Sequence, residues 1–432
     1  MITLEFSMVS NLLIITESMM PFTSNWGACQ RIYHYAKKMV SEGILVTVIC
    51  HNTSDRVDSS ENIEGITVIG HGGRKTSTAS GVRPSGGFKA DLRKKLQAID
   101  RNVKVVSKIV RSTYRFLYSE PNALSGRTSK NWANSVIPFA LDYISKEQVD
   151  AVILSGPTFG LFYHAEEVKA TGVKLILDFR DPWVSWYEKP TLANSAERKA
   201  IECADLVVTT TETLTEALNK KYKTDKCQTV MNGYDKELWS TIELLEHDPS
   251  KFVISYVGNI KINGQPGFRD STCFMSAAKK FKERHPETII QFVGVKDDID
   301  DINPKLKEYV EFRNTVPVAE SLEITAKADV LLMFHTALDP SGKYIICGKA
   351  FDCLRSGNYV LSIGDLAYAN KEIVERTGCG MHCDNNEDAI LTALETIYAK
   401  WKEGDLIDRT RDTEMYSRDY QNTEFLRLIR AL

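Results

Sequence analysis

The sequence predicts an α/β protein built from two doubly wound, Rossmann-like domains, each with a parallel sheet. Short apolar runs bounded by polar residues alternate with segments whose apolar residues recur at helical spacing, and glycine often ends these segments. With 432 residues, the chain is too long for one ordinary domain. A polar, acidic segment at 240–251 separates two such alternating series and is the predicted linker.

The first strand is expected at 11–16, because a continuous apolar run is typical of a strand buried on both faces. A helix at 28–42 and a strand at 44–50 complete a βαβ unit. Its right-handed crossover places the loop 17–27 at the carboxyl edge of the sheet. This loop has no GxGxxG, which disfavours an ordinary Rossmann dehydrogenase.

The rest of the first half continues this order after one interruption. A helix is expected at 159–171, and Thr213 with Glu216 forms a predicted capping box. The loop DFRDPW (178–183) follows a strand; Asp181-Pro182 suits either a helix start or a ligand-binding edge, and both interpretations stay open. The turn NGYD (232–235) closes this half. Further strands are expected at 66–69, 149–155, 173–178, 205–209 and 229–231.

The interruption is a basic insertion at 74–130. It is rich in Lys and Arg, poor in Asp and Glu, and contains one long predicted amphipathic helix. One interpretation is a solvated face packed on its own domain. The other is an electrostatic surface for anionic lipid or a phosphorylated acceptor.

The second half restarts the α/β order. Strands are expected at 252–258, 289–294, 309–312, 330–334 and 359–363, and helices at 271–284 and 387–401. The loop 259–270 carries Lys261 and Arg269 beside glycines, which fits either phosphate neutralisation or a solvated loop. The segment NTVPVAES (314–321) is expected to be a loop.

The segment CGKAFDCLRSGNYVLSIG (347–364) predicts a short helix, a glycine stop at Gly357 and a buried strand. Gly348 and Lys349 open the helix, where free backbone N–H groups and the positive dipole end favour an anion. Asp352 lies one turn later, where a carboxylate suits sugar hydroxyls. The combination fits a nucleotide-sugar, although α/β proteins commonly contain such helix–glycine–strand units.

Composition excludes several classes of protein. A net charge of −3 argues against a dedicated nucleic-acid binder, and no apolar run has the length of a transmembrane helix. Neither a signal peptide nor a metal site is predicted, because the N-terminus lacks a basic leader and DDIDD (297–301) lacks ordered ligand spacing. Nine scattered cysteines without a CxxC pair indicate free thiols in a reducing cytoplasm.

Several motifs, in their joint order, resemble glycosyltransferase family 4. In the first half these are the segment 21–31 ending in WGACQR, GPTF (156–159), DFRDPW (178–183) and MNGYD (231–235). In the second half they are YVGN (256–259), FVGV (292–295), TVPVAES (315–321), ADVLLMF (328–334) and CGKAFDCLRSGNYVLS (347–362).

The resemblance implies the GT-B architecture, in which two Rossmann-like domains face each other across a cleft. The expected domains are 1–243 on the acceptor side, 244–405 for the nucleotide-sugar, and a segment 406–432 that crosses back to the first domain. The implied activity moves a sugar from a nucleotide-sugar to a glycan or lipid-linked acceptor in polysaccharide or glycolipid biosynthesis, with retention. No cofactor or metal is implied, and the enzyme would be cytoplasmic or peripheral on the inner face of the membrane.

Site residues carry over by matching motifs. Asp352 stands where the family places a Glu that holds the ribose hydroxyls, and Gly348 with Lys349 matches the phosphate-binding helix start. The other implied donor-side residues are Gly258, Asn259, Lys261, Arg269, Val316 and Pro317. The implied acceptor and cleft residues are Trp26, Gly27, Pro157, Arg180, Asp181 and Asn232.

The implied chemistry follows from charge. Lys349, Lys261, Arg269 and the helix start would stabilise the leaving nucleoside diphosphate without a metal, with Asp352 holding its ribose. The sequence departs from the family pattern where Tyr344 replaces a Glu, and where Ser155-Gly156-Pro157 stands in place of a common His. His164 is expected to be structural. A nucleotide-sugar epimerase and a non-catalytic nucleotide-sugar-binding protein are the alternatives.

Overall fold

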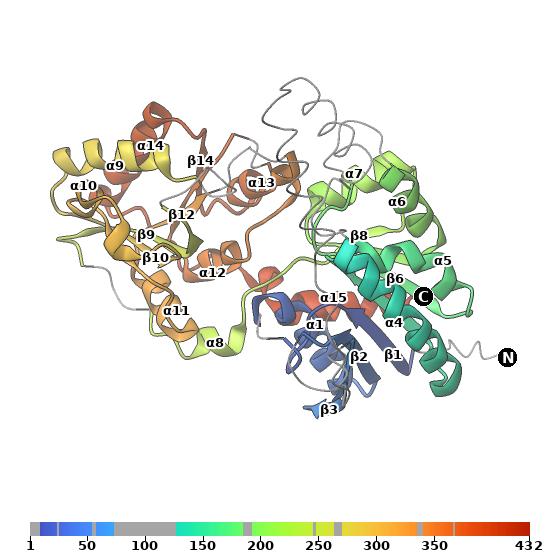
Figure 1. Cartoon of the computed structure of the whole chain (residues 1–432). Coiled ribbons are helices and arrows are strands. Elements are labelled where there is room, and N and C mark those ends of the chain that lie inside the picture. Colours follow the sequence, from blue (N-terminus) through green and yellow to red (C-terminus); the bar gives the residue numbers. More distant parts are fainter. Residues whose placement is uncertain are drawn as a thin grey trace, which may run out of the picture. The chain divides into compact units, whose positions relative to one another are not determined.

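The computed structural model describes residues 9–23, 26–53, 58–72, 127–184, 192–244, 248–262, 270–334, 340–365 and 368–432. The basic insertion lies outside these residues except for 127–130. The described chain divides into two compact units, one of 9–177 with 192–204 and the other of 178–184 with 205–432. Figure 1 shows the elements of both units.

In the part of the chain that the structure describes, the first sheet has the strand order β3-β4-β2-β1-β5-β6-β7-β8. Strand β1 pairs parallel with β2 and with β5, and β2 pairs parallel with β4. Among the described strand pairings, β3 and β4 form the antiparallel one, a hairpin at the edge of this sheet. The strands are β1 (Asn11–Thr16), β2 (Leu45–His51), β3 (Ser60–Ile63), β4 (Ile66–His71), β5 (Ala151–Gly156), β6 (Lys174–Phe179), β7 (Leu206–Thr209) and β8 (Cys227–Thr229).

The second sheet has the order β11-β10-β9-β12-β13-β14, and its described pairings are all parallel. In chain order this is 3-2-1-4-5-6, the doubly wound arrangement, with the order reversing between β9 and β12. The strands are β9 (Phe252–Ile260), β10 (Thr288–Val295), β11 (Glu311–Arg313), β12 (Val330–Phe334), β13 (Tyr359–Ile363) and β14 (Gly380–Cys383). The prediction of two doubly wound α/β sheets is therefore confirmed.

The helices follow the strands in alternation. Among the described residues, those before β9 are α1 (Trp26–Ser41), α4 (Arg127–Glu147), η2 (Phe159–His164), α5 (Ala165–Lys169), α6 (Leu192–Cys203), α7 (Glu212–Tyr222) and α8 (Lys236–Ser240). Those after it are α9 (Thr272–Arg284), η3 (Ile299–Asp301), α10 (Pro304–Lys307), α11 (Val318–Lys327), η4 (Pro340–Tyr344), α12 (Lys349–Ser356), α13 (Tyr368–Thr377), α14 (Glu387–Glu403), η5 (Glu414–Tyr416) and α15 (Arg418–Arg430).

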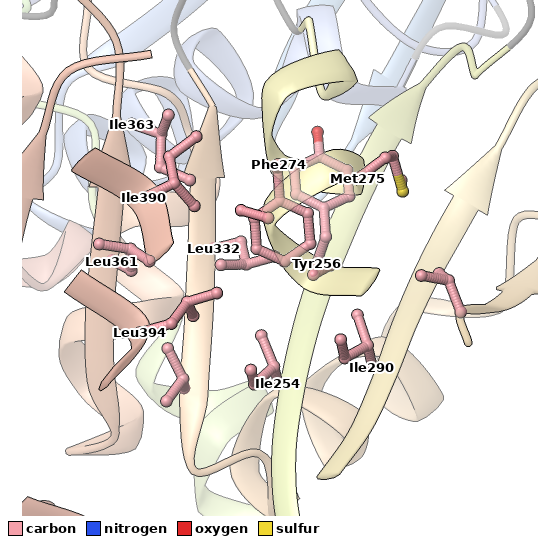
Figure 2. Packing of buried hydrophobic residues seen from close by; sticks show 14 of the residues in the cluster. Ile254, Tyr256, Phe274, Met275, Ile290, Leu332, Leu361, Ile363, Ile390 and Leu394 are labelled. Carbon is pink, nitrogen blue, oxygen red and sulfur yellow. The ribbon is translucent and has the colours of Figure 1, made fainter. Parts of the chain in front are cut away.

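Successive side chains of β12 and β13 point to opposite faces of the second sheet, and each face carries an apolar core. Leu332 and Leu361 point to one face, where they pack with α9 and α14 (Figure 2). Leu331 and Val360 point to the other, where they pack with α11, α12 and α13. The sheet is buried on both sides, as its continuous apolar strands predict.

Three local expectations were wrong. The helix expected at 159–171 is the 3₁₀ turn η2 followed by the short α5, and η2 buries Phe159 through Phe162 in a row, whereas an α-helix on a surface buries one side. The cap of α7 is Thr211, whose hydroxyl accepts the Leu214 N–H at 3.2 Å, so Thr213 with Glu216 is not the capping box. Part of the loop expected at 314–321 is the start of α11. Of the two interpretations left open for Asp181-Pro182, the helix start is not found within 181–184.

Candidate functional site

The reversal of strand order in the second sheet marks where a ligand is expected. In open α/β sheets, ligands bind outside the carboxyl ends of the two strands that flank this reversal. Here those strands are β9, which leads to Lys261, and β12, which is followed along the chain by η4 and α12. The donor-side residues predicted from the sequence belong mainly to these two connections and to the start of α11.

The start of α12 lacks a side-chain cap. Gly348 occupies the cap position with helical angles (φ −57°, ψ −30°), and a Cβ added to it would meet nothing within 4 Å. The first backbone N–H groups of a helix have no partner inside the helix. Open space beside these groups gives an anion access to the positive end of α12.

Lys349 brings a cation to the same turn. Its Nζ lies 3.8 Å from Oδ2 of Asp352 and 3.5 Å from Oγ of Ser321 in α11. Its side chain is 41 % exposed. Both separations are at the long limit for direct contact, so a phosphate oxygen can compete for this ammonium group.

Asp352 is held by a residue that sequence reasoning missed. The indole Nε1 of Trp239, in α8, donates a 3.0 Å hydrogen bond to Oδ1 of Asp352, and Trp239 is buried. The guanidinium of Arg355 lies over the Trp239 ring, 5.8 Å from its centroid. Oδ1 is therefore engaged, while Oδ2 lies on the side of Lys349.

Arg418 is the second residue that the motifs did not indicate. It begins α15, and its Nε donates a 2.9 Å hydrogen bond to the carbonyl of Gly233. An amino group of Arg418 lies 3.6 Å from Oδ2 of Asp235. Burial lowers the pKa of Arg418, while the negative charges of Asp235 and Asp352 oppose that shift.

The turn NGYD is built against the C-terminal segment. The Tyr234 N–H donates to the carbonyl of Tyr416 at 3.1 Å, and Tyr234 forms a parallel bridge with Ser417. A Cβ added to Gly233 would lie 2.6 Å from the backbone nitrogen of Arg418. Glycine is required here by a close backbone approach as well as by the turn, and the partly buried Asn232 precedes it.

Glycines also allow β9 and β10 to approach each other at their carboxyl ends. Gly294 has a φ of +101°, and a Cβ there would lie 2.4 Å from the carbonyl oxygen of Gly258. Nearby, Val316 packs against Val257 and Val293. The structure therefore brings Gly258 and Val316 to one end of the sheet, with Pro317 at the start of α11. Asn259 is exposed near the end of β9, and Lys261 is exposed directly after that strand.

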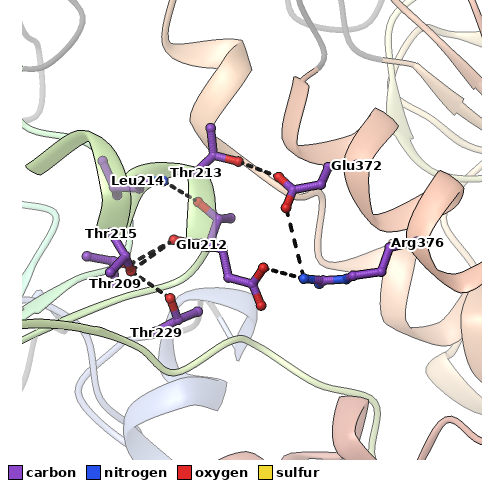
Figure 3. Close-up of polar contacts among 9 residues, drawn as sticks. Thr209, Glu212, Thr213, Leu214, Thr215, Thr229, Glu372 and Arg376 are labelled. Atoms are coloured by element: carbon purple, nitrogen blue, oxygen red, sulfur yellow. Dashed lines mark hydrogen bonds and ion pairs between the residues drawn. The ribbon is translucent and has the colours of Figure 1, made fainter. Parts of the chain in front are cut away.

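The loop before α12 is anchored by α7 and α13. The Thr211 hydroxyl donates to the carbonyl of Tyr344 at 2.8 Å. Figure 3 shows the adjoining contacts, in which Thr213 donates to Glu372 at 2.8 Å and Arg376 pairs with Glu212. The Thr211 contact holds the backbone at Tyr344, and the other contacts join α7 to α13, which are far apart in the sequence.

The remaining predicted site residues belong to separate elements. Gly27 lies in the first turn of α1, which follows β1, and Pro157 directly follows β5. Arg180 and Asp181 follow β6, and burial raises the pKa of Asp181 against the opposing charge of Arg180. Arg269 and the side chain of Trp26 lie outside what the structure describes.

Three further groups were considered. Asp297 accepts a hydrogen bond from the backbone N–H of Ile262, and Asp298 accepts one from the backbone N–H of Asp300, so both carboxylates cap loops. No cluster of three potential metal ligands occurs among the described residues. Both ring nitrogens of His164 are hydrogen-bonded, to Glu167 and Asn134, which agrees with a structural role. Within the same residues, no helix has the length and apolar character of a membrane span.

Comparisons with known proteins agree with this fold. No family model and no curated protein matches the chain. Sucrose-phosphate synthase from Thermosynechococcus elongatus has a TM-score of 0.61 at 13 % identity, with 98 % of each chain covered. The catalytic domain of starch synthase IV from Arabidopsis thaliana, bound to ADP and acarbose, has a TM-score of 0.58 at 11 % identity over 99 % of this chain and 100 % of that one.

A putative UDP-N-acetylglucosamine 2-epimerase from Listeria monocytogenes has a TM-score of 0.53 at 12 % identity, over 98 % of this chain and 96 % of that one. At these identities the likeness shows the fold alone. The GT-B type of fold expected from the sequence is confirmed. Membership of glycosyltransferase family 4 stays a prediction.

Proposed function

We propose that the protein is a glycosyltransferase that moves a sugar from a nucleotide-sugar to a glycan or lipid-linked acceptor. One observation carries the proposal most directly. The uncapped, open start of α12, with Lys349 in its first turn, follows one of the strands at the reversal of the second sheet. A helix start with an adjacent cation suits the diphosphate of such a donor.

The proposed chemistry is stabilisation of the leaving group. Cleavage at the anomeric carbon leaves a nucleoside diphosphate, so negative charge develops on its phosphate while positive charge spreads over the sugar ring. Lys349 and the N–H groups of α12 meet that charge, and one well-placed donor is worth about 3 kcal/mol. Lys261 and Arg269 add cations, and Asp352 holds the ribose. The proposed reaction proceeds without a metal and with retention.

The proposed acceptor side is the carboxyl edge of the first sheet. Gly27 and Pro157 belong to connections after β1 and β5, where the strand order of that sheet reverses. Arg180 and Asp181 follow β6, and the carboxyl of Asp181 has a raised pKa because it is buried. Trp26 and Asn232 complete the set by resemblance.

We also propose a cytoplasmic, membrane-peripheral location in which the basic segment 74–130 contacts anionic lipid. Lys- and Arg-rich segments bind anionic bilayers through charge, and salt screens that attraction. Sedimentation with anionic liposomes is expected to decrease as salt increases. Absence of binding at low salt would return the segment to an ordinary solvated surface.

A nucleotide-sugar epimerase is the second candidate, because the putative epimerase above has the same fold. A protein that binds the donor without turnover is the third. Incubation with a panel of UDP-, GDP- and ADP-sugars separates the three. Slow hydrolysis of one donor supports the transferase, interconversion of its sugar supports the epimerase, and binding without either supports the binding protein.

A further inference from the structure

Asn370, in α13, contacts the backbone just before the start of α12. Its side chain is fully buried, and its Oδ1 accepts the backbone N–H of Cys347 at 3.3 Å. Because an N–H group must meet an oxygen, this bond fixes which branch of the carboxamide is Oδ1 and which is Nδ2. Nδ2 is buried and has no hydrogen-bond partner in the described chain.

A buried amide donor without an acceptor is costly, and such groups in native proteins usually meet a ligand or an ordered water. Asn370 binds Cys347, the residue directly before Gly348, and α12 has no side-chain cap. A donor in need of an acceptor therefore lies beside a helix start that is open to an anion. The two observations are independent, since one concerns α13 and the other concerns α12.

Asn370 also fixes the backbone that enters α12. The loop before this helix is held at the Tyr344 carbonyl by Thr211 and at the Cys347 N–H by Asn370. The Ala350 N–H then donates to the Cys347 carbonyl at 2.9 Å, which begins the first turn. Displacement of Cys347 would therefore shift the first turn of α12.

We propose that Asn370 is a further donor of the phosphate site at the start of α12. Its Oδ1 sets the position of Cys347, and its Nδ2 binds a phosphate oxygen, directly or through one bound water. The assignment of that phosphate to a nucleoside diphosphate rests on the proposed function. The anion site itself does not depend on it.

The test is Asn370→Asp, measured by calorimetric titration at pH 8. Aspartate keeps an oxygen for the Cys347 N–H but replaces the donor with a second, negatively charged acceptor. The probes are inorganic pyrophosphate, the tightest of UDP, GDP and ADP, and its parent nucleoside. We expect about tenfold or greater loss of affinity for pyrophosphate and nucleotide, and no change for the nucleoside.

The matched control is Asn386→Asp. Asn386 caps α14 by accepting the Ala389 N–H at 2.9 Å, and aspartate caps a helix equally well. This control makes the same change of charge, so its affinities are expected to equal those of the wild type. If Asn370→Asp fails to fold, the Asn370 side-chain amide resonance of asparagine-labelled wild type is followed instead, and it is expected to shift on addition of pyrophosphate.

The outcomes separate this inference from the proposed function. Unchanged affinities in Asn370→Asp, equal losses for nucleoside and nucleotide, or an amide resonance unmoved by pyrophosphate would each overturn the role of Asn370. Suppose that the wild type binds pyrophosphate but no nucleotide, and that Asn370→Asp loses affinity for pyrophosphate. This result supports Asn370 as a phosphate donor and refutes the nucleotide-sugar function. Wild type that binds neither refutes both.

Discussion

The indole N–H of Trp239 donates a 3.0 Å hydrogen bond to Oδ1 of Asp352, and this bond joins α8 to α12, the helix whose start is the proposed anion site. It holds the carboxylate in one orientation, with Oδ2 on the side of Lys349. The proposed ribose contact of Asp352 therefore depends on a buried residue of α8. Preorganisation of this kind lowers the ordering cost of binding.

Trp239→Phe is expected to weaken nucleoside diphosphate binding about tenfold, because Asp352 loses the donor that orients it. Calorimetric titration measures the affinity, and thermal unfolding measures the accompanying loss of packing. Trp401→Phe is the control, since Trp401 packs against Phe252 in the core on the other face of the second sheet. Equal affinities in the two variants would remove Trp239 from the site.

Gly348→Ala is expected to separate binding from stability. Gly348 has helical angles and free space around its Cβ direction, so alanine fits and stabilises the fold by about 0.5–1 kcal/mol. The added methyl group occupies the approach to the first N–H groups of α12, and nucleotide affinity is expected to fall. Full affinity in a stable Gly348→Ala variant would place the phosphate elsewhere.

Gly233→Ala is expected to lower the stability of the fold. A Cβ at this position would lie 2.6 Å from the backbone nitrogen of Arg418, so the turn NGYD and the start of α15 must separate. Overpacking of this kind costs about 1–3 kcal/mol, measured as a lower free energy of unfolding in urea. A variant as stable as the wild type would show that the C-terminal segment does not press on this turn.

Asp150→Asn tests the charge that ties the beginnings of β1 and β5. Oδ2 of Asp150 accepts the Ser10 N–H, the Ser10 hydroxyl and the Asn11 N–H at 2.8–2.9 Å. Burial raises the pKa of Asp150, but these hydrogen bonds outweigh it and lower the pKa overall.

A lowered folded-state pKa stabilises the protein above the unfolded value of about 3.9, and this contribution disappears as the pH falls through the folded value. Urea unfolding should therefore show wild type about 1–2 kcal/mol more stable than Asp150→Asn at pH 7, with the difference shrinking below about pH 4. Asp142→Asn, at an exposed pair with Lys146, is the control and should show little difference at any pH. A pH-independent difference at Asp150 would contradict the account.

Most elements of the second sheet could be predicted from the sequence, because buried parallel strands are continuous apolar runs with clear limits. The limits of β12 and β13 agree with the prediction, and Gly357 ends α12 with a φ of +75°. Helix α4 was not predicted, and it contains Pro138, a residue that is disfavoured inside a helix. Its buried residues Trp132, Val136, Ala140 and Ile144 nevertheless recur at every fourth position, a signal that was present.

The site was harder to predict, because its supporting residues come from segments without a motif. Lys349 and Asp352 share one helix turn, so their proximity follows from local sequence. Trp239 reaches Asp352 from α8, and Arg418 reaches the turn NGYD from α15, only through the fold. Asn370 is equally unremarkable in sequence, and its importance comes from burial and an unmet donor.

The most direct test of the central claim is a crystal structure of the protein with a bound nucleoside diphosphate. The account predicts a phosphate oxygen within about 3 Å of the first N–H groups of α12 and of the Lys349 ammonium group. It also predicts that the ribose lies against Asp352. A nucleotide bound away from Gly348 and Lys349 would contradict the account.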